Sequence, residues 1–217
     1  MALALLTGCG AANSSVSGES QVGSSSAAPA ASIAASVPDL SLTAGAPSAE
    51  VPPSASSQAP SLAVLQSSPP VRIEVPAIGT DSELLDLGLQ PDGTLEVPPD
   101  AVTVGWYTGG PTPGELGPAV IVGHVDWAGT EGVFYNLRNM VTGDQITVTR
   151  ADGSVAVFEV RANEQFPKDQ FPTAAVYGDI DHAGLRLITC GGSYDPAARS
   201  YLDNIVVFAD LIGSTTA

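Results

Sequence analysis

Short apolar segments, each closed by a turn signal, follow one another from residue 71 to near the end of the chain. Residues 71–75 (VRIEV) alternate apolar and polar side chains and stop at Pro76, which predicts a strand with one buried face. Residues 119–124 (AVIVGH) are nearly all apolar, as expected for a strand buried on both faces. Further strands are predicted at 84–89, 94–97, 145–149, 155–160, 185–189 and 205–208, with Asp152-Gly153 as a hairpin turn.

This succession of short strands predicts an all-β domain, either a sandwich or a barrel. Two segments, 133–140 and 172–177, are the predicted short helices. A closed barrel is favoured, because closure removes the exposed strand edges on which proteins aggregate.

Residues 10–70 have a different composition from the rest of the chain. Ala, Ser, Pro, Gly and Val dominate them, and they contain no Lys, no Arg and no aromatic residue. Such a segment has little to bury and cannot offset the entropy of ordering, so we predict a disordered linker. The predicted organisation is an amino-terminal segment at 1–9, the linker at 10–70 and a folded domain at 71–212.

Residues 1–9 (MALALLTGC) are a short apolar run, and their last four residues resemble the lipobox of bacterial lipoproteins. That resemblance implies a truncated signal sequence and lipidation of Cys9, with two acyl chains sufficient for stable membrane anchoring. The alternative is a clipped ordinary signal peptide or anchor helix, which also implies export. We therefore expect an extracytoplasmic protein held at the membrane surface by its amino terminus.

Charge and cysteine content exclude two classes of protein. The net charge is −16 with only seven Lys and Arg residues, so a nucleic-acid-binding patch is not expected. Two cysteines, Cys9 and Cys190, are too few for a disulfide scaffold. Each cysteine therefore requires its own explanation.

The candidate chemistry lies at the ends of two apolar strands. Cys190 ends one run and is followed by Gly191 and Gly192, which predicts a thiol exposed at a rim beside approachable backbone. His124 ends the other run in the same way, although a rim histidine held by hydrogen bonds is an equal alternative when it is taken alone. A thiol and an imidazole at two strand ends together predict a nucleophile and its proton partner.

The residues around this pair resemble the sortases, the cysteine transpeptidases of Gram-positive surfaces. The segments VGHVD (122–126) and LITCGG (187–192) are similar to the histidine and cysteine signatures of that family. The segments VRIEVPAIG (71–79), GWY (105–107), FYNL (134–137) and GD (143–144) follow the family's order. The resemblance covers residues 70–212 and is greatest to the actinobacterial class E/F type.

The resemblance implies a closed eight-stranded β-barrel with one or two short helices and a two-step acyl transfer. Cys190, as a thiolate, would attack the carbonyl of a Leu-Pro-x-Thr-Gly-like sorting signal and form a thioester. His124, as an imidazolium that favours the thiolate, would protonate the departing amine and then activate the acceptor amine. The implied acceptor is a peptidoglycan precursor of the cell wall, and the implied enzyme is a monomer without metal or cofactor.

One part of the sortase pattern is missing. Sortases use an arginine near the start of the last strand to stabilise the substrate oxyanion, and Asn204 occupies that place here. Arg199 is the alternative donor if its loop folds over Cys190; otherwise it is a solvated loop residue, and Asn204 a strand-end cap. Asp126 is a candidate to orient His124, or an Asx-turn residue. Thr189 is a candidate to line the substrate pocket; alternatively, it has only a structural role within its strand.

Two rival functions follow from these features. An L,D-transpeptidase would carry a His-Gly-Cys cluster, which this sequence lacks. A sortase-shaped lipoprotein that has lost catalysis and acts as a binding or scaffold module is kept open by Asn204. A thiol within hydrogen-bond reach of His124 and open to a groove would support the enzyme, whereas a thiol packed in apolar surroundings would support the scaffold.

Overall fold

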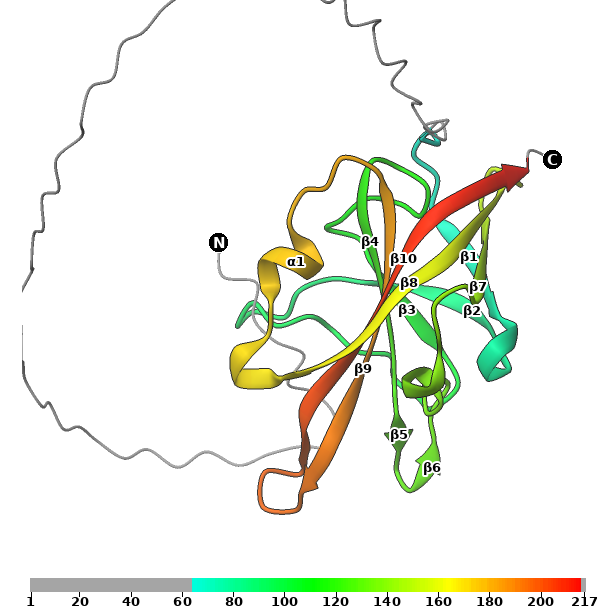
Figure 1. Ribbon diagram of the computed structural model, residues 1–217. Helices are drawn as coiled ribbons and strands as arrows, with labels where there is room; N and C mark the ends of the chain where they lie inside the picture. Colours follow the sequence, from blue (N-terminus) through cyan, green and yellow to red (C-terminus); the bar gives the residue numbers. More distant parts are fainter. Residues whose placement is uncertain (1–63, 216–217) are drawn as a thin grey trace, which may run out of the picture. The chain divides into compact units, whose positions relative to one another are not determined.

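Eight strands of the computed structural model close into one β-barrel, in the order β1-β2-β3-β4-β9-β10-β8-β7 (Figure 1). The structure describes residues 64–215, so Cys9 and residues 10–63 of the predicted linker lie outside the described residues. The barrel strands are β1 (Pro70–Val75), β2 (Thr80–Leu87), β3 (Val104–Tyr107), β4 (Gly117–Gly123), β7 (Gln145–Arg150), β8 (Val155–Pro167), β9 (Ala183–Asp195) and β10 (Ser200–Thr215). The prediction of a closed all-β barrel is confirmed.

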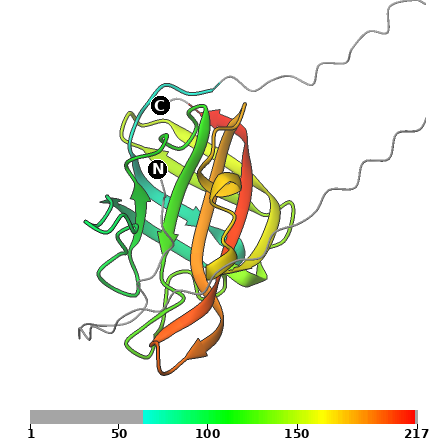
Figure 2. The same cartoon turned by 90° about the vertical axis from the view of Figure 1, so that its left-hand side faces the viewer.

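Alternate strand residues face the barrel interior and pack into its core. A second apolar cluster lies on the outer face of β4, β9 and β10, where Val122, Ile188 and Val206 meet Val176 of α1 (Thr173–Tyr177). Figure 2 shows α1 in front of β9 on this outer face. The interior core includes Ile73, Ile121, Phe158, Leu187 and Val207, all fully buried.

The parallel pair formed by β4 and β9 positions the candidate chemistry. Its register runs from Gly117 opposite Ala183 to Val122 opposite Ile188. Because the carboxyl ends of parallel strands meet at one edge, the residue that follows β4 lies beside the second half of β9. The barrel thereby brings together two segments that are far apart in the sequence.

The remaining elements are short. They are the two-stranded hairpin of β5 (Asp126–Trp127) and β6 (Thr130–Glu131) and three 3₁₀ turns, η1 (Pro76–Ile78), η2 (Leu137–Asn139) and η3 (Lys168–Gln170). The prediction of a helix at 172–177 is confirmed by α1. The predicted helix at 133–140 is wrong, because only the turn η2 forms there. Its buried side chains, Phe134, Leu137 and Met140, recur every three residues, a spacing that suits a 3₁₀ turn better than an α-helix.

Three strands are longer than the apolar pattern predicts. β8, β9 and β10 extend to residues 167, 195 and 215, and β10 pairs with both of the others along most of its length. In these extensions the backbone ladder keeps polar segments extended although they lack apolar alternation. The predicted strand at 94–97 is reduced to one bridge between Leu89 and Leu95.

The described residues that precede β1 run along the barrel. The backbone N–H of Leu65 donates to the carbonyl of Gly114 at 2.8 Å, and that of Ser68 donates to Thr112 Oγ1 at 3.1 Å. These residues have linker-like composition but are held by hydrogen bonds. Within residues 64–215, no helix has the length and apolar character needed to cross a membrane.

Candidate active site

Cys190 and His124 line the same small cavity on the outer side of the barrel. His124 follows β4 directly and Cys190 lies on β9, each two residues beyond the paired residues Val122 and Ile188. The parallel ladder therefore holds the imidazole and the thiol at equivalent positions on neighbouring strands. The cavity is completed by Val97, Pro98, Val122, Gly123, Ile188 and Thr189.

The thiol of Cys190 is not exposed at a rim as the sequence predicts. Cys190 is only 4% exposed, and β9 continues past it to Asp195. The two glycines serve close packing with β10. A Cβ on Gly191 would lie 2.7 Å from the side chain of Ile205, and one on Gly192, whose φ is 74°, would lie 2.2 Å from Asp203. Glycine here lets the strand continue rather than end.

His124 is buried and its ring is held on two sides. Its Nε2 lies 2.7 Å from the carbonyl oxygen of Pro98. Because a carbonyl only accepts, Nε2 carries a hydrogen. The ring also packs on Trp127, with centroids 4.6 Å apart and planes tilted by 40°. These contacts orient a side chain that the sequence alone leaves as either a catalytic residue or a rim histidine.

Asp100 adds a negative charge close to this histidine. Its carboxylate accepts hydrogen bonds from the backbone N–H groups of Val102 and Thr103, at 3.0 and 2.8 Å. The hydrogen bonds of Thr103 are the main cause that lowers the pKa of Asp100, and His124 adds a smaller electrostatic contribution in the same direction. The turn after Pro98 is thus fixed by an ionised carboxylate.

Asn204 stands opposite Cys190 in the antiparallel pair of β9 and β10. Directly opposed residues project to the same face of a sheet, so the amide lies on the face that carries the thiol. Asn204 is fully buried, and neither its Nδ2 nor its Oδ1 forms a hydrogen bond to any residue within 64–215. A buried amide without partners is costly, and such groups are rare outside functional sites.

Thr189 borders the cavity of Cys190, as the sequence predicts, but its side chain is on the other face of the sheet, and Asp126 lines a different cavity. Thr189 stands opposite Ile205, an interior core residue, so its hydroxyl faces the inside of the barrel, where it is buried without a hydrogen-bond partner among the described residues. Asp126, on β5, accepts a hydrogen bond from the hydroxyl of Tyr201. That bond links the β5–β6 hairpin to the first residues of β10.

Arg199 lines a second cavity, of about 730 Å³, between the β5–β6 hairpin and the turn joining β9 to β10. Its side chain is exposed and its φ is +49°. Figure 1 shows this turn and the hairpin projecting together beyond the barrel. The two cavities share no lining residue, so the structure does not bring Arg199 into the cavity of Cys190. The second cavity is lined by Asp126, Trp127, Ala128, Gly129, Thr130, Glu131, Tyr135, Tyr194, Arg199 and Tyr201.

Comparison with known proteins identifies the family. The sortase domain matches residues 73–212, which is more than half of the chain. The chain belongs to the sortase family. Among curated proteins, no sequence matches the chain.

Solved structures of sortases share the fold. Sortase A of Listeria monocytogenes is 14% identical with a TM-score of 0.52, and the match covers 70% of this chain and 92% of that one. Sortase C of Streptococcus pneumoniae is 20% identical with a TM-score of 0.52, covering 68% and 70%. Sortase A of Corynebacterium diphtheriae is 23% identical with a TM-score of 0.50, covering 67% and 62%. Sortases are cysteine transpeptidases of the cell surface that act on sorting-signal substrates and amine acceptors.

The structure of this sortase adds one residue that the sequence does not indicate. Lys168, in η3, places its Nζ 3.6 Å from Sγ of Cys190 and 3.0 Å from Oγ of Ser200. It is the single lysine in the chain, and it stands in the segment FPKDQFP (166–172) between two Phe-Pro pairs. The two flanking Phe-Pro pairs were the one sequence feature that could have drawn attention to Lys168. The segment is otherwise polar, however, and a polar loop gives no reason to expect a buried lysine side chain.

Proposed function

We propose that this sortase cleaves a Leu-Pro-x-Thr-Gly-like sorting signal through a thioester on Cys190 and transfers the acyl group to an amine of the cell wall. The proposal rests on one observation: the thiol of Cys190 and the imidazole of His124 line the same cavity, held there by the register of β4 and β9. A nucleophile beside an oriented proton donor is what covalent acyl transfer requires.

In the first step the thiolate of Cys190 attacks the carbonyl carbon of the scissile peptide bond. The sulfur forms a bond to carbon, and the π electrons of the carbonyl move onto oxygen. When this intermediate collapses, the bond from carbon to nitrogen breaks and the protonated imidazole of His124 gives its proton to the departing amine. The products are a thioester on Cys190 and a neutral imidazole.

In the second step the neutral imidazole of His124 accepts a proton from the acceptor amine as its nitrogen attacks the thioester. A new amide bond forms and the thiolate of Cys190 leaves. The imidazolium and the thiolate are then restored together, so the cycle needs no further proton from solvent. We propose a peptidoglycan precursor as the acceptor, on the basis of the family's use of amine acceptors.

We propose the amide of Asn204 as the donor to the oxyanion. Its support is its place opposite Cys190 together with two polar atoms that have no hydrogen-bond partner in the described part of the chain. An N–H donor directed at the developing charge contributes about 10²–10³ in rate. Arg199 is the rival donor; it requires the turn between β9 and β10 to close over the thiol.

The second cavity suits the approach of the acceptor amine. It is lined by Asp126 and Glu131, whose carboxylates can accept hydrogen bonds from the N–H groups of a neutral amine, and its Trp127 packs on the ring of His124. An acceptor that approaches through this cavity reaches the site on the side of His124 on which Trp127 packs. We propose a role for Asp126 on this side, as part of the acceptor site.

We further propose that the enzyme is an actinobacterial sortase of the class E/F type. The support is the pattern VGHVD (122–126) with LITCGG (187–192). We propose that it is a monomer held at the cell surface by a lipid on Cys9. The part of the predicted linker that precedes residue 64 would be the spacer between membrane and barrel, since residues 65 and 68 are hydrogen-bonded to the barrel. Replacement of Cys9 by serine should then release the protein from the membrane fraction of its host.

Trapping of the acyl-enzyme tests the main proposal. The full chain with Cys9→Ser, which leaves Cys190 as the one thiol, is incubated with a library of sorting peptides and its intact mass is measured. We expect a mass increase equal to the acyl part of the peptide, absent in Cys190→Ala and discharged by an added amine. If no peptide of the library is cleaved or forms an acyl-enzyme, the transpeptidase proposal fails. Binding without cleavage would support the scaffold alternative.

A further inference from the structure

We infer that Lys168 is a further catalytic residue of this sortase, whose ammonium group pairs with the thiolate of Cys190. Its role in turnover rests on the proposed function, whereas the ion pair itself can be measured without any peptide. The inference assigns a cation to a site in which the expected arginine is replaced by Asn204.

The contacts of Lys168 direct its ammonium group to the sulfur. Nζ lies 3.6 Å from Sγ of Cys190 and donates a hydrogen bond to Oγ of Ser200 at 3.0 Å. The hydroxyl of Ser200 in turn donates to the carbonyl of Tyr201 at 3.2 Å, so its lone pairs face the ammonium. Ser200 is thus a fixed acceptor that holds Nζ beside the thiol.

Charge balance gives the second reason. Lys168 is only 9% exposed, and none of the ion pairs found in residues 64–215 includes it. A buried ammonium group is costly unless an anion accompanies it. The thiol of Cys190, 3.6 Å from Nζ, is a group that can supply this anion. The protein therefore gains from ionisation of this thiol, and the thiolate is the reactive form of cysteine.

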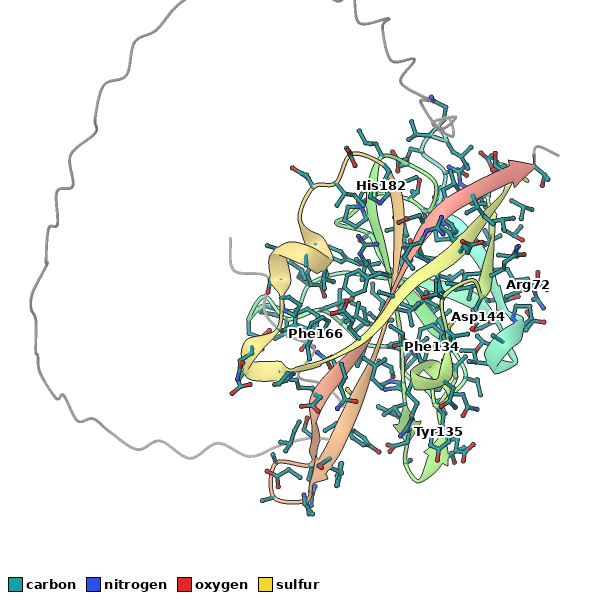
Figure 3. The ribbon with its side chains drawn as sticks, viewed as in Figure 1. Arg72, Phe134, Tyr135, Asp144, Phe166 and His182 are labelled. Atoms are coloured by element: carbon teal, nitrogen blue, oxygen red, sulfur yellow. The ribbon has the colours of Figure 1, made fainter. Side chains whose placement is uncertain are left out.

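The fold explains how a distant residue reaches the sulfur. Phe166 on β8 stands opposite Asn204 on β10, and Asn204 stands opposite Cys190 on β9, so the three lie in one rung across the sheet. Figure 3 shows Phe166 at this end of β8, away from His182 at the other end of the barrel. η3 begins two residues after Phe166, and its first side chain extends over the rung to the thiol.

The ammonium keeps its protons throughout the reaction. It stabilises the thiolate before attack and loses that partner when the sulfur bonds to the carbonyl carbon and the negative charge moves to oxygen. The proton of the departing amine comes from His124, and the acceptor's proton returns to His124. When the second step releases the thiolate, the ion pair with Lys168 forms again.

Thiol alkylation across a range of pH tests the ion pair. The full chain with Cys9→Ser is reacted with iodoacetamide, and the rate is compared with those of Lys168→Met and Lys168→Arg in the same background. An adjacent opposite charge shifts an ionisation by roughly one to three pH units. We therefore expect Lys168→Met to react at least about tenfold more slowly near neutral pH, with its half-maximal rate at higher pH. Lys168→Arg should keep most of the wild-type profile.

The control is Arg138→Met, which removes one exposed cation outside both cavities and should leave the profile unchanged. Lys168→Gln and Lys168→Ala replace Lys168→Met if the latter does not fold, as judged by circular dichroism. An unchanged profile in a folded, uncharged variant overturns the inference. So does faster alkylation with the same half-point, which would make Lys168 a mere cover of the thiol.

The two proposals fail separately. A shifted alkylation profile without cleavage of any sorting peptide would retain the ion pair and reject the transpeptidase. Cleavage at the wild-type rate by Lys168→Met would retain the transpeptidase and reject the catalytic role of Lys168.

Discussion

Asn204 and Cys190 face each other across the antiparallel pair of β9 and β10, and the buried amide of Asn204 has no hydrogen-bond partner in residues 64–215. This relationship separates the site from one that depends on an arginine in the last strand. The amide of Asn204 provides uncharged N–H donors in the position of the arginine. The cation beside the sulfur is Lys168, which belongs to η3, directly after β8. In our proposal the hydrogen-bond donor and the cation of the site are therefore two separate residues.

Replacement of Asn204 by alanine is expected to lower turnover by about 10²–10³, the usual loss when one oxyanion donor is removed. The loss of turnover should not be accompanied by a large fall in melting temperature, because the variant also removes two buried polar atoms that have no hydrogen-bond partner. Peptide cleavage and thermal unfolding followed by circular dichroism measure the two effects. A turnover close to that of the wild type would remove Asn204 from the oxyanion site.

Replacement of Arg199 by alanine separates the two candidate donors. Arg199 is exposed and lies in the other cavity, so we expect acyl-enzyme formation to stay within about threefold of the wild type, as for most surface substitutions. Single-turnover trapping by intact mass measures this rate directly. A loss of about a hundredfold or more would instead assign the oxyanion to Arg199 and show that its turn closes during catalysis.

Trp127 is expected to contribute to catalysis through the orientation of His124. An aromatic pair of this kind contributes about 0.5–1.5 kcal/mol, so Trp127→Ala should lower kcat roughly two- to tenfold. Trp127→Phe preserves a ring and serves as the matched control, with a smaller loss. Equal kcat values for the alanine variant and the wild type would mean that the hydrogen bond to Pro98 alone holds the imidazole.

Acid should selectively weaken the turn that carries Asp100. Its folded-state pKa is lowered from 3.8, chiefly by the hydrogen bonds of Thr103, so its ionised form stabilises the fold. That stabilisation is complete above the unfolded pKa and is lost as the pH falls through the folded pKa. The wild type should therefore exceed Asp100→Asn in stability by a constant amount from neutral pH down to about pH 4, and by less below it. Urea unfolding of both proteins across this range measures the difference, and a pH-independent difference would contradict the assignment.

The elements that could be predicted from the sequence are those that the pattern of apolar and polar residues within a single segment determines. The alternation in 71–75 and the apolar run in 119–124 correspond to β1 and β4, because burial of one or both strand faces leaves a direct trace in the pattern. Both His124 and Cys190 were predicted as strand-end groups. This is correct for His124, which follows β4, and wrong for Cys190, because β9 continues to Asp195; the register of β4 and β9 brings the two residues together.

The features that the sequence missed depend on pairing between distant segments. Lys168 reaches the thiol because β8 and β9 both pair with β10, which no local pattern records. The burial of Cys190 was missed because glycine after an apolar run usually marks the end of a strand, whereas here it permits close packing of β10. The helix at 133–140 was predicted because its apolar residues are periodic, but their period of three belongs to a tighter turn.

The shared ladder of β4 and β9 also limits which changes in length this sortase can accept. Side chains alternate along a strand. Inserting or deleting one residue within β4, or within β9 before Cys190, would therefore exchange the side chains that face the inside and the outside of the barrel. Cys190 would then point into the core, where Thr189 now lies, and the imidazole would lose its neighbour. We therefore expect changes in length to be tolerated in the connections between strands and not within these two strands, because His124 and Cys190 stay neighbours only while the register of β4 and β9 is kept.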